Sequence, residues 1–395
     1  MRTVVIAGAA RTPLGSFQGE LAELPAPVLG GVAIRAALAQ ARLGTVDEVV
    51  MGCVLSAGIG QAPARQAGFA AGLGDGVPAT TLNKMCGSGM KAVMLAYDQV
   101  ALGGAGTIVA GGMESMTNAP YLLAKLRGGA RIGHQSVQDS LFLDGLEDAY
   151  DRASDGSRRL MGSFAEDWAS AFGFDRAAQD AYALQSLADA RRAQAEGAFA
   201  AEIAPVRIEG RSGRATITVD EQPGRARPDR IAQLRPAFRP DGTVTAANAS
   251  SISDGAAALV IAAGQVARAR GLPLRAQVMG HATHAGPPGR FTTAPVPAAR
   301  ALLRKLGWQV GDVDLWEVNE AFAVVPMAFM AEMGVPRDRL NVHGGACALG
   351  HPIGASGARI IVTLLHALER RGLNRGVAAI CIGGGEATAV AIERP

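Results

Sequence analysis

The chain has 395 residues, of which 49% are hydrophobic and 18% charged, and its formal net charge is +3 at pH 7. This length exceeds one ordinary hydrophobic core, and the composition excludes disordered and fibrous classes of protein. The small net charge gives no support for nucleic-acid binding, and no uncharged apolar stretch is long enough to cross a membrane. We therefore expect a globular protein of two or three domains, with neither nucleic acid nor membrane as a partner.

The N-terminal residues 3–8 (T-V-V-I-A-G) predict a strand that opens the fold. They lack the basic region followed by a longer apolar region that directs secretion. The cysteines are too few for a disulfide framework and show no C-x-x-C spacing of a zinc site; they are Cys53, Cys86, Cys347 and Cys381. These features predict a cytoplasmic protein with free thiols and no metal site.

The chain repeats itself, because two helix–strand units near the N-terminus have counterparts in the same order near the C-terminus. The strands are continuous apolar runs, as is typical of sheets covered on both faces. The repeat predicts an α/β fold of two related halves with layered helices and sheets. The matched units are a helix over 27–44 with a strand over 46–50 and a helix over 295–311 with a strand over 313–318, then a helix from Ser88 with a strand over 107–110 and a helix from Ser356 with a strand over 377–382.

Residues 118–241 have no counterpart in the other half and predict an inserted lobe with a helix over 175–196. The first half would then comprise residues 1–117 and 242–270, and the second half residues 271–395. The lobe is rich in arginine, which indicates either a solvated charged face or a site for a ligand that carries phosphates. The arginines concerned are at positions 207, 211, 214, 225, 227, 230, 235 and 239.

Residues 83–90 (N-K-M-C-G-S-G-M) place Cys86 directly before a helix, in a glycine-flanked turn. The partial positive charge of a helix N-terminus lowers the pKa of a thiol and favours the nucleophilic thiolate. A buried structural cysteine is the alternative, but glycines fill a core poorly. The turn therefore predicts a nucleophile.

Residues 350–357 (G-H-P-I-G-A-S-G) place His351 before the matching helix of the second half. Histidine has a pKa suited to a general base, although a lone histidine is more often structural. The repeat puts the Cys86 turn and this loop at equivalent strand-to-helix positions. Both turns would face one cleft if the two halves are related by a pseudo-twofold axis.

Two further turns carry candidate groups. Residues 381–385 (C-I-G-G-G) follow an apolar strand, so that the backbone N–H of Gly383 is free for an oxyanion and Cys381 could transfer a proton. Residues 319–323 (N-E-A-F-A) offer Asn319, which could hold a water or cap a helix. Two thiols and one histidine suit Claisen chemistry better than hydrolysis, because one thiol can carry an acyl group while another serves the α-carbon.

These motifs resemble those of the thiolase family, over nearly the whole chain. The resemblance rests on residues 83–92, 319–323, 350–357 and 381–385, together with residues 243–257, which resemble the pantetheine-contacting stretch of the family. It implies a thiolase-like fold and the reversible conversion of two acetyl-coenzyme A to acetoacetyl-coenzyme A and coenzyme A, with longer 3-ketoacyl substrates as well. Coenzyme A would be substrate and product, with no other cofactor.

The resemblance also implies roles for individual residues. Cys86 would be the acylated nucleophile, His351 its base and Cys381 the acid/base at the α-carbon. Asn319 would hold a water that forms one oxyanion hole with His351, and the N–H groups of Cys86 and Gly383 would form the other. The implied acyl and pantetheine pocket consists of Met161, Phe238, Ser250, Phe322 and, where family members devoted to acetoacetyl-coenzyme A carry histidine, Leu160.

Several alternatives stay open from the residues alone. Within the resemblance, a degradative 3-ketoacyl-coenzyme A thiolase of fatty-acid β-oxidation is the first. A condensing enzyme of fatty-acid synthesis, a catalytically reduced lipid-binding protein and a cysteine hydrolase are the others. The inserted lobe would dock the nucleotide end of coenzyme A, and the loop over 124–138 suggests a homodimer or homotetramer.

Overall fold

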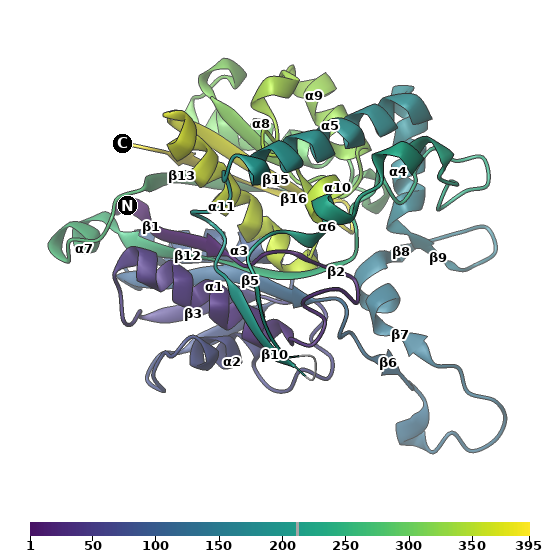
Figure 1. The fold of residues 1–395 in the computed structure, drawn as a ribbon, viewed down its shortest axis with the longest axis horizontal. Helices are drawn as coiled ribbons and strands as arrows, with labels where there is room; N and C mark the ends of the chain where they lie inside the picture. The colour runs from purple at the N-terminus through teal and green to yellow at the C-terminus, as the bar shows by residue number, and fades with distance from the viewer. Residues whose placement is uncertain (211–212) are drawn as a thin grey trace.

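The computed structural model describes residues 1–210 and 213–395. Its centre is a ten-stranded mixed sheet (Figure 1). The strands across it are β14 (Leu315–Val318), β15 (Arg375–Ile382), β16 (Glu386–Glu393), β13 (Ala276–Ala285), β1 (Val4–Arg11), β12 (Ser253–Ala263), β5 (Thr107–Ser115), β3 (Glu48–Gly52) and β4 (Ala79–Leu82), with the short β2 (Gly15–Ser16) beside β12.

The sheet consists of two similar halves that meet between β1 and β13. This joint has only two residue pairs, Val5 with Gln277 and Ile6 with Ala276. Outward from it, β12 and β5 follow β1 in antiparallel pairing and β3 is parallel to β5; on the other side β16 and β15 follow β13 in antiparallel pairing and β14 is parallel to β15. The repeat predicted from the sequence is therefore confirmed in the order and direction of the strands.

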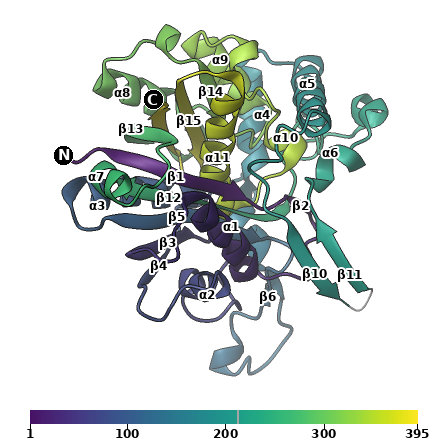
Figure 2. The same cartoon turned by 60° about the vertical axis from the view of Figure 1, so that its left-hand side comes forward.

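Helices cover both faces of each half (Figures 1 and 2). The outer helices are α1 (Ala26–Ala41) and α2 (Pro63–Ala70) on the first half, and α8 (Pro295–Leu306) and α9 (Val324–Met333) on the second. Between the halves lie α3 (Ser88–Leu102) and α11 (Ile353–Arg371), the second of which begins three residues earlier than the sequence indicated. The chain thus forms alternating layers of helices and sheets.

Alternate residues of the strands pack into different cores. In β1, Val4 and Ile6 join the core that surrounds α3 and α11, whereas Val5 and Ala7 pack with residues of α1. All eight residues of β1 are buried, because side chains alternate between two covered faces. This explains why the sequence shows continuous apolar runs.

The two central helices cross at glycines. A Cβ atom on Gly89 would lie 2.9 Å from the backbone nitrogen of Ala358, and one on Gly357 would lie 2.5 Å from the backbone nitrogen of Met90. Neither position has room for a side chain, so the backbones approach more closely than ordinary helix packing allows. The crossing brings the N-terminal ends of both helices to the same part of the molecule.

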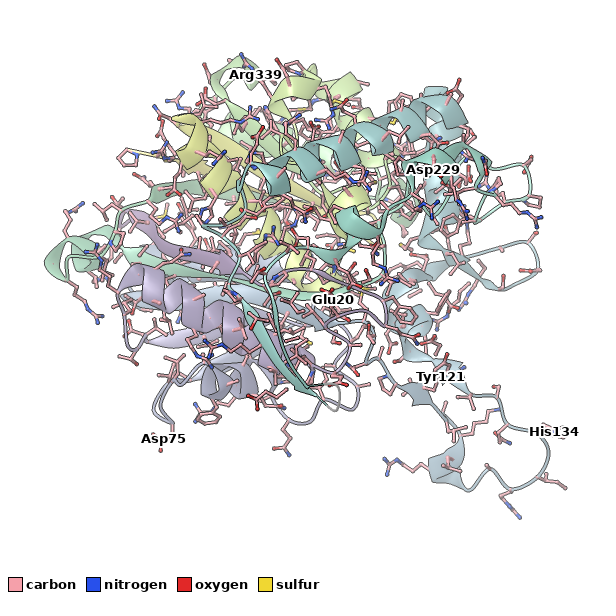
Figure 3. The ribbon with its side chains drawn as sticks, viewed as in Figure 1. Glu20, Asp75, Tyr121, His134, Asp229 and Arg339 are labelled. Atoms are coloured by element: carbon pink, nitrogen blue, oxygen red, sulfur yellow. The ribbon has the colours of Figure 1, made fainter. Side chains whose placement is uncertain are left out.

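The inserted lobe contains the predicted long helix as α5 (Arg176–Ala195), whose N-cap Asp175 accepts a hydrogen bond from the backbone of Ala178 at 2.7 Å. A hairpin arm projects from the body between Tyr121 and Asp139 (Figures 1 and 3). The other lobe elements are β6 (Tyr121–Leu122), η1 (Leu126–Gly128), β7 (Gln138–Asp139), η2 (Phe142–Leu146), β8 (Glu147–Arg152), β9 (Arg158–Leu160), α4 (Met161–Phe172), β10 (Val206–Gly210), β11 (Gly213–Ile217), α6 (Glu221–Arg225) and η3 (Pro228–Gln233).

The remaining short elements lie between the larger ones. They are α7 (Gly264–Ala269), η4 (Pro288–Arg290), η5 (Val310–Asp312), η6 (Arg337–Arg339) and α10 (Ala346–Leu349). Within the described residues, no helix is both long and apolar enough to span a bilayer.

A buried ion-pair cluster attaches the lobe to the sheet. Arg11, at the end of β1, places its Nε 2.5 Å from Glu202 and its Nη1 2.6 Å from Asp220. All three side chains are fully buried. Because removing one partner of such a cluster leaves an uncompensated charge out of water, Arg11 is a strong anchor between the two parts.

We predict that Arg11→Ala lowers the free energy of unfolding by about 3–5 kcal/mol, since Glu202 and Asp220 lose their cation. Denaturant titration followed by circular dichroism measures the change. The control is Arg227→Ala, whose ion pair with Asp229 is exposed on both sides and should contribute less than about 1 kcal/mol. Equal effects of the two substitutions would contradict the anchoring role.

Candidate active site

Cys86 lies in a strained turn between β4 and α3. Met85, just before it, adopts φ +47°, which is rare for a residue with a side chain. The turn is held by Ser88, whose hydroxyl donates to the carbonyl of Met85 at 2.6 Å and accepts from the N–H of Lys84 at 2.8 Å. The side-chain oxygen of Asn83 accepts from the N–H of Met85 at 2.9 Å. The predicted strained turn at the start of a helix is therefore present.

The predicted lowering of the Cys86 pKa is wrong. Burial raises the pKa of this thiol to about 11, and the charge of Glu114 acts in the same direction. The backbone N–H groups of Gly383 and of Cys86 itself stabilise the thiolate but do not outweigh burial. The resting group is a thiol with two N–H donors beside its sulfur, and it needs a base.

His351 lies in the loop between α10 and α11 and has the protonation state of a base. The Ser356 hydroxyl donates to the carbonyl of Pro352 at 3.0 Å, so the contact of 2.6 Å between its oxygen and Nδ1 of His351 requires the hydrogen to be on Nδ1. Nε2 is then bare, and it has no hydrogen-bond partner among the described residues. Burial, together with the charge of Arg359, lowers the pKa of His351 to about 3, so the ring is neutral at physiological pH.

Cys381 and Asn319 lie at the carboxyl ends of β15 and β14. Both are fully buried. Burial and the proximity of the Cys86 sulfur raise the pKa of Cys381 well above its usual value. Neither side-chain atom of Asn319 has a hydrogen-bond partner in the described part of the chain. The N-cap of α9 is Ala323, so the interpretation of Asn319 as a helix cap is wrong.

One largely apolar cavity of about 370 Å³ gathers most of the predicted site residues. Asn319 and Cys381 are not on its wall but lie in the buried layer around it. Sequence reasoning missed several apolar wall residues, among them Phe142, Ile252 and Phe291, which carry no motif of their own. The predicted residues on the wall are Cys86, Leu160, Met161, Phe238, Ser250, Phe322, His351 and Gly383.

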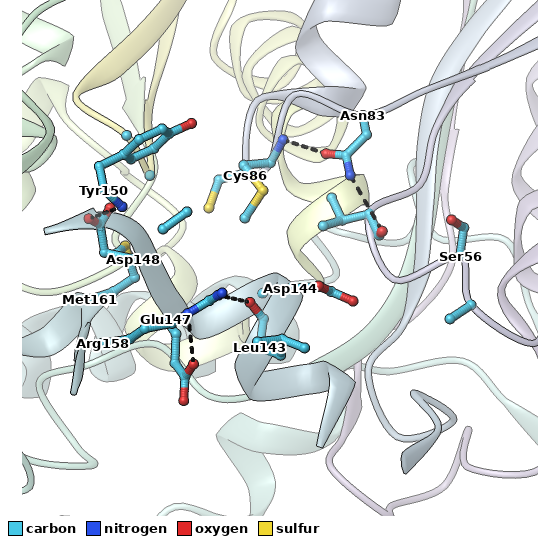
Figure 4. Close-up of a pocket in the computed structure, with 17 residues that line it drawn as sticks. Ser56, Asn83, Cys86, Leu143, Asp144, Glu147, Asp148, Tyr150, Arg158 and Met161 are labelled. Carbon is cyan, nitrogen blue, oxygen red and sulfur yellow. Dashed lines mark hydrogen bonds and ion pairs between the residues drawn. The ribbon is translucent and has the colours of Figure 1, made fainter. Parts of the chain in front are cut away.

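A second cavity, of about 510 Å³, reaches the same thiol from another side (Figure 4). It shares Cys86, Gly145, Met161 and Gly383 with the first cavity. In the view of Figure 4, Cys86 lies between Asn83 and Tyr150. A group attached to the Cys86 sulfur would therefore have space in two directions.

A third cavity, of about 560 Å³, is open and basic. It shares Leu160 and Phe238 with the first cavity, and its arginines are Arg152, Arg158, Arg159 and Arg239. Of the arginines that the sequence analysis proposed for phosphates, only Arg239 lines it. The other three lie outside the segment that sequence reasoning selected, because only the fold brings the β8–β9 hairpin to this place.

The remaining arginines of that segment are not gathered with this group. Arg225 pairs with Glu221 at 2.6 Å, and Arg227 pairs with Asp229 at 3.4 Å. Arg211 lies outside the described residues, as does the side chain of Arg214. His343, the other histidine near the second motif, packs its ring edge against Phe199, with 5.8 Å between ring centres.

The geometry supports acyl transfer to a thiol. A neutral histidine with a bare Nε2 faces the same cavity as Cys86, and two backbone N–H groups lie at the reacting sulfur. A second thiol lies close enough for its pKa to respond to the first. The site thus combines a nucleophile, a base, an oxyanion-binding pair and a further proton-transfer group.

Comparisons with known proteins agree with this geometry over the full chain. Residues 4–265 match the thiolase N-terminal domain and residues 272–394 the thiolase C-terminal domain. An acetyl-CoA acetyltransferase of Pseudomonas aeruginosa is 47% identical, covering 100% of both chains, and acetyl-CoA acetyltransferase 2 of Arabidopsis thaliana is 48% identical, covering 99% of this chain and 97% of the relative.

Solved structures give the same result. The acetyl-CoA acetyltransferase of Bacillus anthracis superposes with a TM-score of 0.96 at 37% identity, over 100% of this chain and 99% of its own. A thiolase of Ascaris suum, solved in complex with coenzyme A, superposes with a TM-score of 0.93 at 41% identity, over 100% of both chains. The chain belongs to the thiolase family and is an acyltransferase.

Proposed function

We propose that this thiolase cleaves acetoacetyl-coenzyme A with coenzyme A to give two acetyl-coenzyme A, and runs the reverse condensation, through an acyl-Cys86 intermediate. The observation that carries the proposal is the bare Nε2 of neutral His351 in the cavity that also exposes the Cys86 thiol. The relatives named acetyl-CoA acetyltransferase support the same substrate.

In cleavage, His351 removes the proton of the Cys86 thiol as the sulfur attacks the 3-keto carbon. The N–H groups of Cys86 and Gly383 stabilise the oxygen that becomes negative at that carbon. The carbon–carbon bond then breaks, which leaves an acetyl group on Cys86 and the enolate of acetyl-coenzyme A. Asn319, through a water, and His351 stabilise the enolate oxygen.

Cys381 supplies the proton that this enolate takes up at its α-carbon. The resulting Cys381 thiolate accepts the thiol proton of an incoming coenzyme A, whose sulfur attacks the acetyl group on Cys86. The second acetyl-coenzyme A leaves, and both cysteines are thiols again. In this proposal coenzyme A is substrate and product, and the chemistry requires neither a metal nor a redox cofactor.

The cavities supply a path for coenzyme A. The basic cavity suits its phosphates, because arginine binds phosphate through charge-assisted hydrogen bonds. Leu160 and Phe238 form the passage from there to the apolar cavity, where Met161, Ser250 and Phe322 would contact pantetheine and the acyl group. Docking of coenzyme A thus involves the inserted lobe, as the sequence analysis proposed, but through a different set of arginines.

The degradative thiolase of β-oxidation is not favoured, since the relatives given above carry acetyltransferase names. A role in fatty-acid metabolism at large rests on the second cavity, which leaves room for longer acyl groups. A lipid-binding protein without catalysis would not need the bare histidine nitrogen beside a thiol.

We further propose a homodimer or homotetramer in the cytoplasm. The projecting hairpin arm supports assembly, because it exposes apolar side chains that include Tyr121, Leu126 and Ile132. Its shape is visible in Figure 3, where Tyr121 marks its base and His134 its far side. The four free cysteines suit a reducing compartment.

Replacing Cys86 by serine tests the proposed function. We predict that Cys86→Ser keeps the fold but lowers thiolysis of acetoacetyl-coenzyme A by several orders of magnitude, because an alcohol has no accessible anion. The loss of acetoacetyl-coenzyme A is followed with and without coenzyme A. The control Cys53→Ala, whose thiol lines none of the three cavities, should remain active. Consumption of substrate without coenzyme A would instead indicate a hydrolase.

The second cysteine is tested through proton exchange. We predict that Cys381→Ala still forms some acetyl-Cys86 from acetyl-coenzyme A but no longer exchanges the α-protons of acetyl-coenzyme A in deuterated water, because only the α-carbon step needs Cys381. Nuclear magnetic resonance measures the exchange. Exchange at the wild-type rate would remove Cys381 from the mechanism.

Substrate choice is tested at Leu160. Leucine cannot donate a hydrogen bond to a keto or thioester oxygen, and apolar walls favour longer acyl chains by about 0.8 kcal/mol per buried methylene. We predict a kcat/KM on six- or eight-carbon 3-ketoacyl-coenzyme A at least equal to that on the four-carbon substrate. Leu160→His should shift preference toward four carbons. A wild type restricted to four carbons, or an unchanged profile in the variant, would contradict this reading.

A further inference from the structure

Glu320 directly follows Asn319 and is fully buried. Its carboxylate accepts four hydrogen bonds from two other segments of the chain. From α5 of the inserted lobe, the hydroxyls of Tyr182 and Ser186 donate at 2.8 Å each. From the segment before His351, the side chain of Asn341 donates at 2.9 Å and the backbone of Cys347 at 3.1 Å.

The surroundings are built around this carboxylate. A Cβ atom on Gly345 would lie 2.3 Å from the carboxyl carbon of Glu320, so only glycine fits there. The N–H of Gly345 donates to the Ser186 hydroxyl at 3.0 Å, which extends the network from α5 to the loop. Burial and the charge of Glu320 raise the pKa of Tyr182 well above its usual value, so this phenol remains a donor.

The network fixes the backbone on both sides of Asn319. Before it, the N–H of Val318 donates to the side chain of Asn341 at 2.8 Å, and the same side chain donates to the carbonyl of Val318 at 2.8 Å. After it comes Glu320 itself. The Asn319 amide has no partner of its own among the described residues. Its direction therefore depends on how its two neighbours are held.

The same carboxylate reaches the base. Cys347 belongs to α10, which ends at Leu349, and Gly350 and His351 follow directly. One buried group thus ties α5, the Asn319 turn and the start of the His351 loop together. Glu320, Tyr182 and Ser186 line none of the three cavities, so they do not meet the substrate.

We propose that Glu320 is a positioning residue of this thiolase, and that Tyr182 and Ser186 of the inserted lobe act through it to orient the Asn319 amide and the His351 loop. The lobe then serves catalysis as well as coenzyme A binding. This inference rests on the proposed function, in which Asn319 and His351 stabilise the enolate oxygen.

The test is a double-mutant cycle between the lobe and Asn319. Tyr182→Phe and Ser186→Ala should each lower kcat for acetoacetyl-coenzyme A cleavage roughly ten- to a hundredfold and leave KM nearly unchanged, because misplacing a catalytic group slows the reaction step. In an Asn319→Ala background the same substitutions should lower kcat much less, since the group that they orient is gone. The control is Gln185→Ala, an exposed neighbour on α5 that should leave kcat unchanged.

Thermal denaturation of each variant shows whether a loss merely follows unfolding. Equal fold losses of kcat in the two backgrounds, losses that follow the melting temperature, or no loss would overturn the positioning role. Glu320→Gln, which keeps the shape but presents an amide to the Ser186 and Cys347 donors, should behave like Tyr182→Phe if it folds. A wild type that fails to cleave acetoacetyl-coenzyme A would instead overturn the proposed function.

Discussion

The close crossing of α3 and α11 is the constraint on which the site depends. Gly89 and Gly357 leave no room for a side chain at the crossing, and Gly112 is equally restricted because a Cβ atom there would lie 2.0 Å from the carbonyl oxygen of Gly354. Each helix begins next to a reactive group, so the crossing brings the Cys86 turn and the His351 loop to one cavity. A larger residue at any of these glycines would separate the halves and with them the nucleophile and its base.

Burial then decides how the site works. It raises the pKa of the Cys86 thiol to about 11 and lowers that of His351 to about 3, so both groups rest in their neutral forms. A stable thiolate–imidazolium pair is therefore not the resting state, and the proton moves as the substrate is attacked. The donors placed at the reacting atoms, the N–H groups of Cys86 and Gly383, stabilise charge that exists only during the reaction.

Local patterns in the sequence predicted much of this. The internal repeat predicted the two halves, and the glycine-rich turns predicted the reactive residues, because both depend on neighbours along the chain. The direction of the Cys86 pKa shift was wrong, since the helix-terminus argument ignores the burial that only the packed halves produce. The arginines of the β8–β9 hairpin and the Glu320 network also escaped prediction, because their members come from distant segments that meet only after folding.

The central claim is that the Cys86 thiol, served by the bare nitrogen of His351, is the group that carries the acyl chain. Peptide mass spectrometry after brief incubation with acetyl-coenzyme A and acid quenching tests it most directly. The account predicts an acetyl group on the peptide that contains Cys86, and a strongly reduced amount when His351 is replaced by alanine. An acetyl group on Cys53, Cys347 or Cys381 in its place, or equal acetylation of Cys86 without His351, would contradict it.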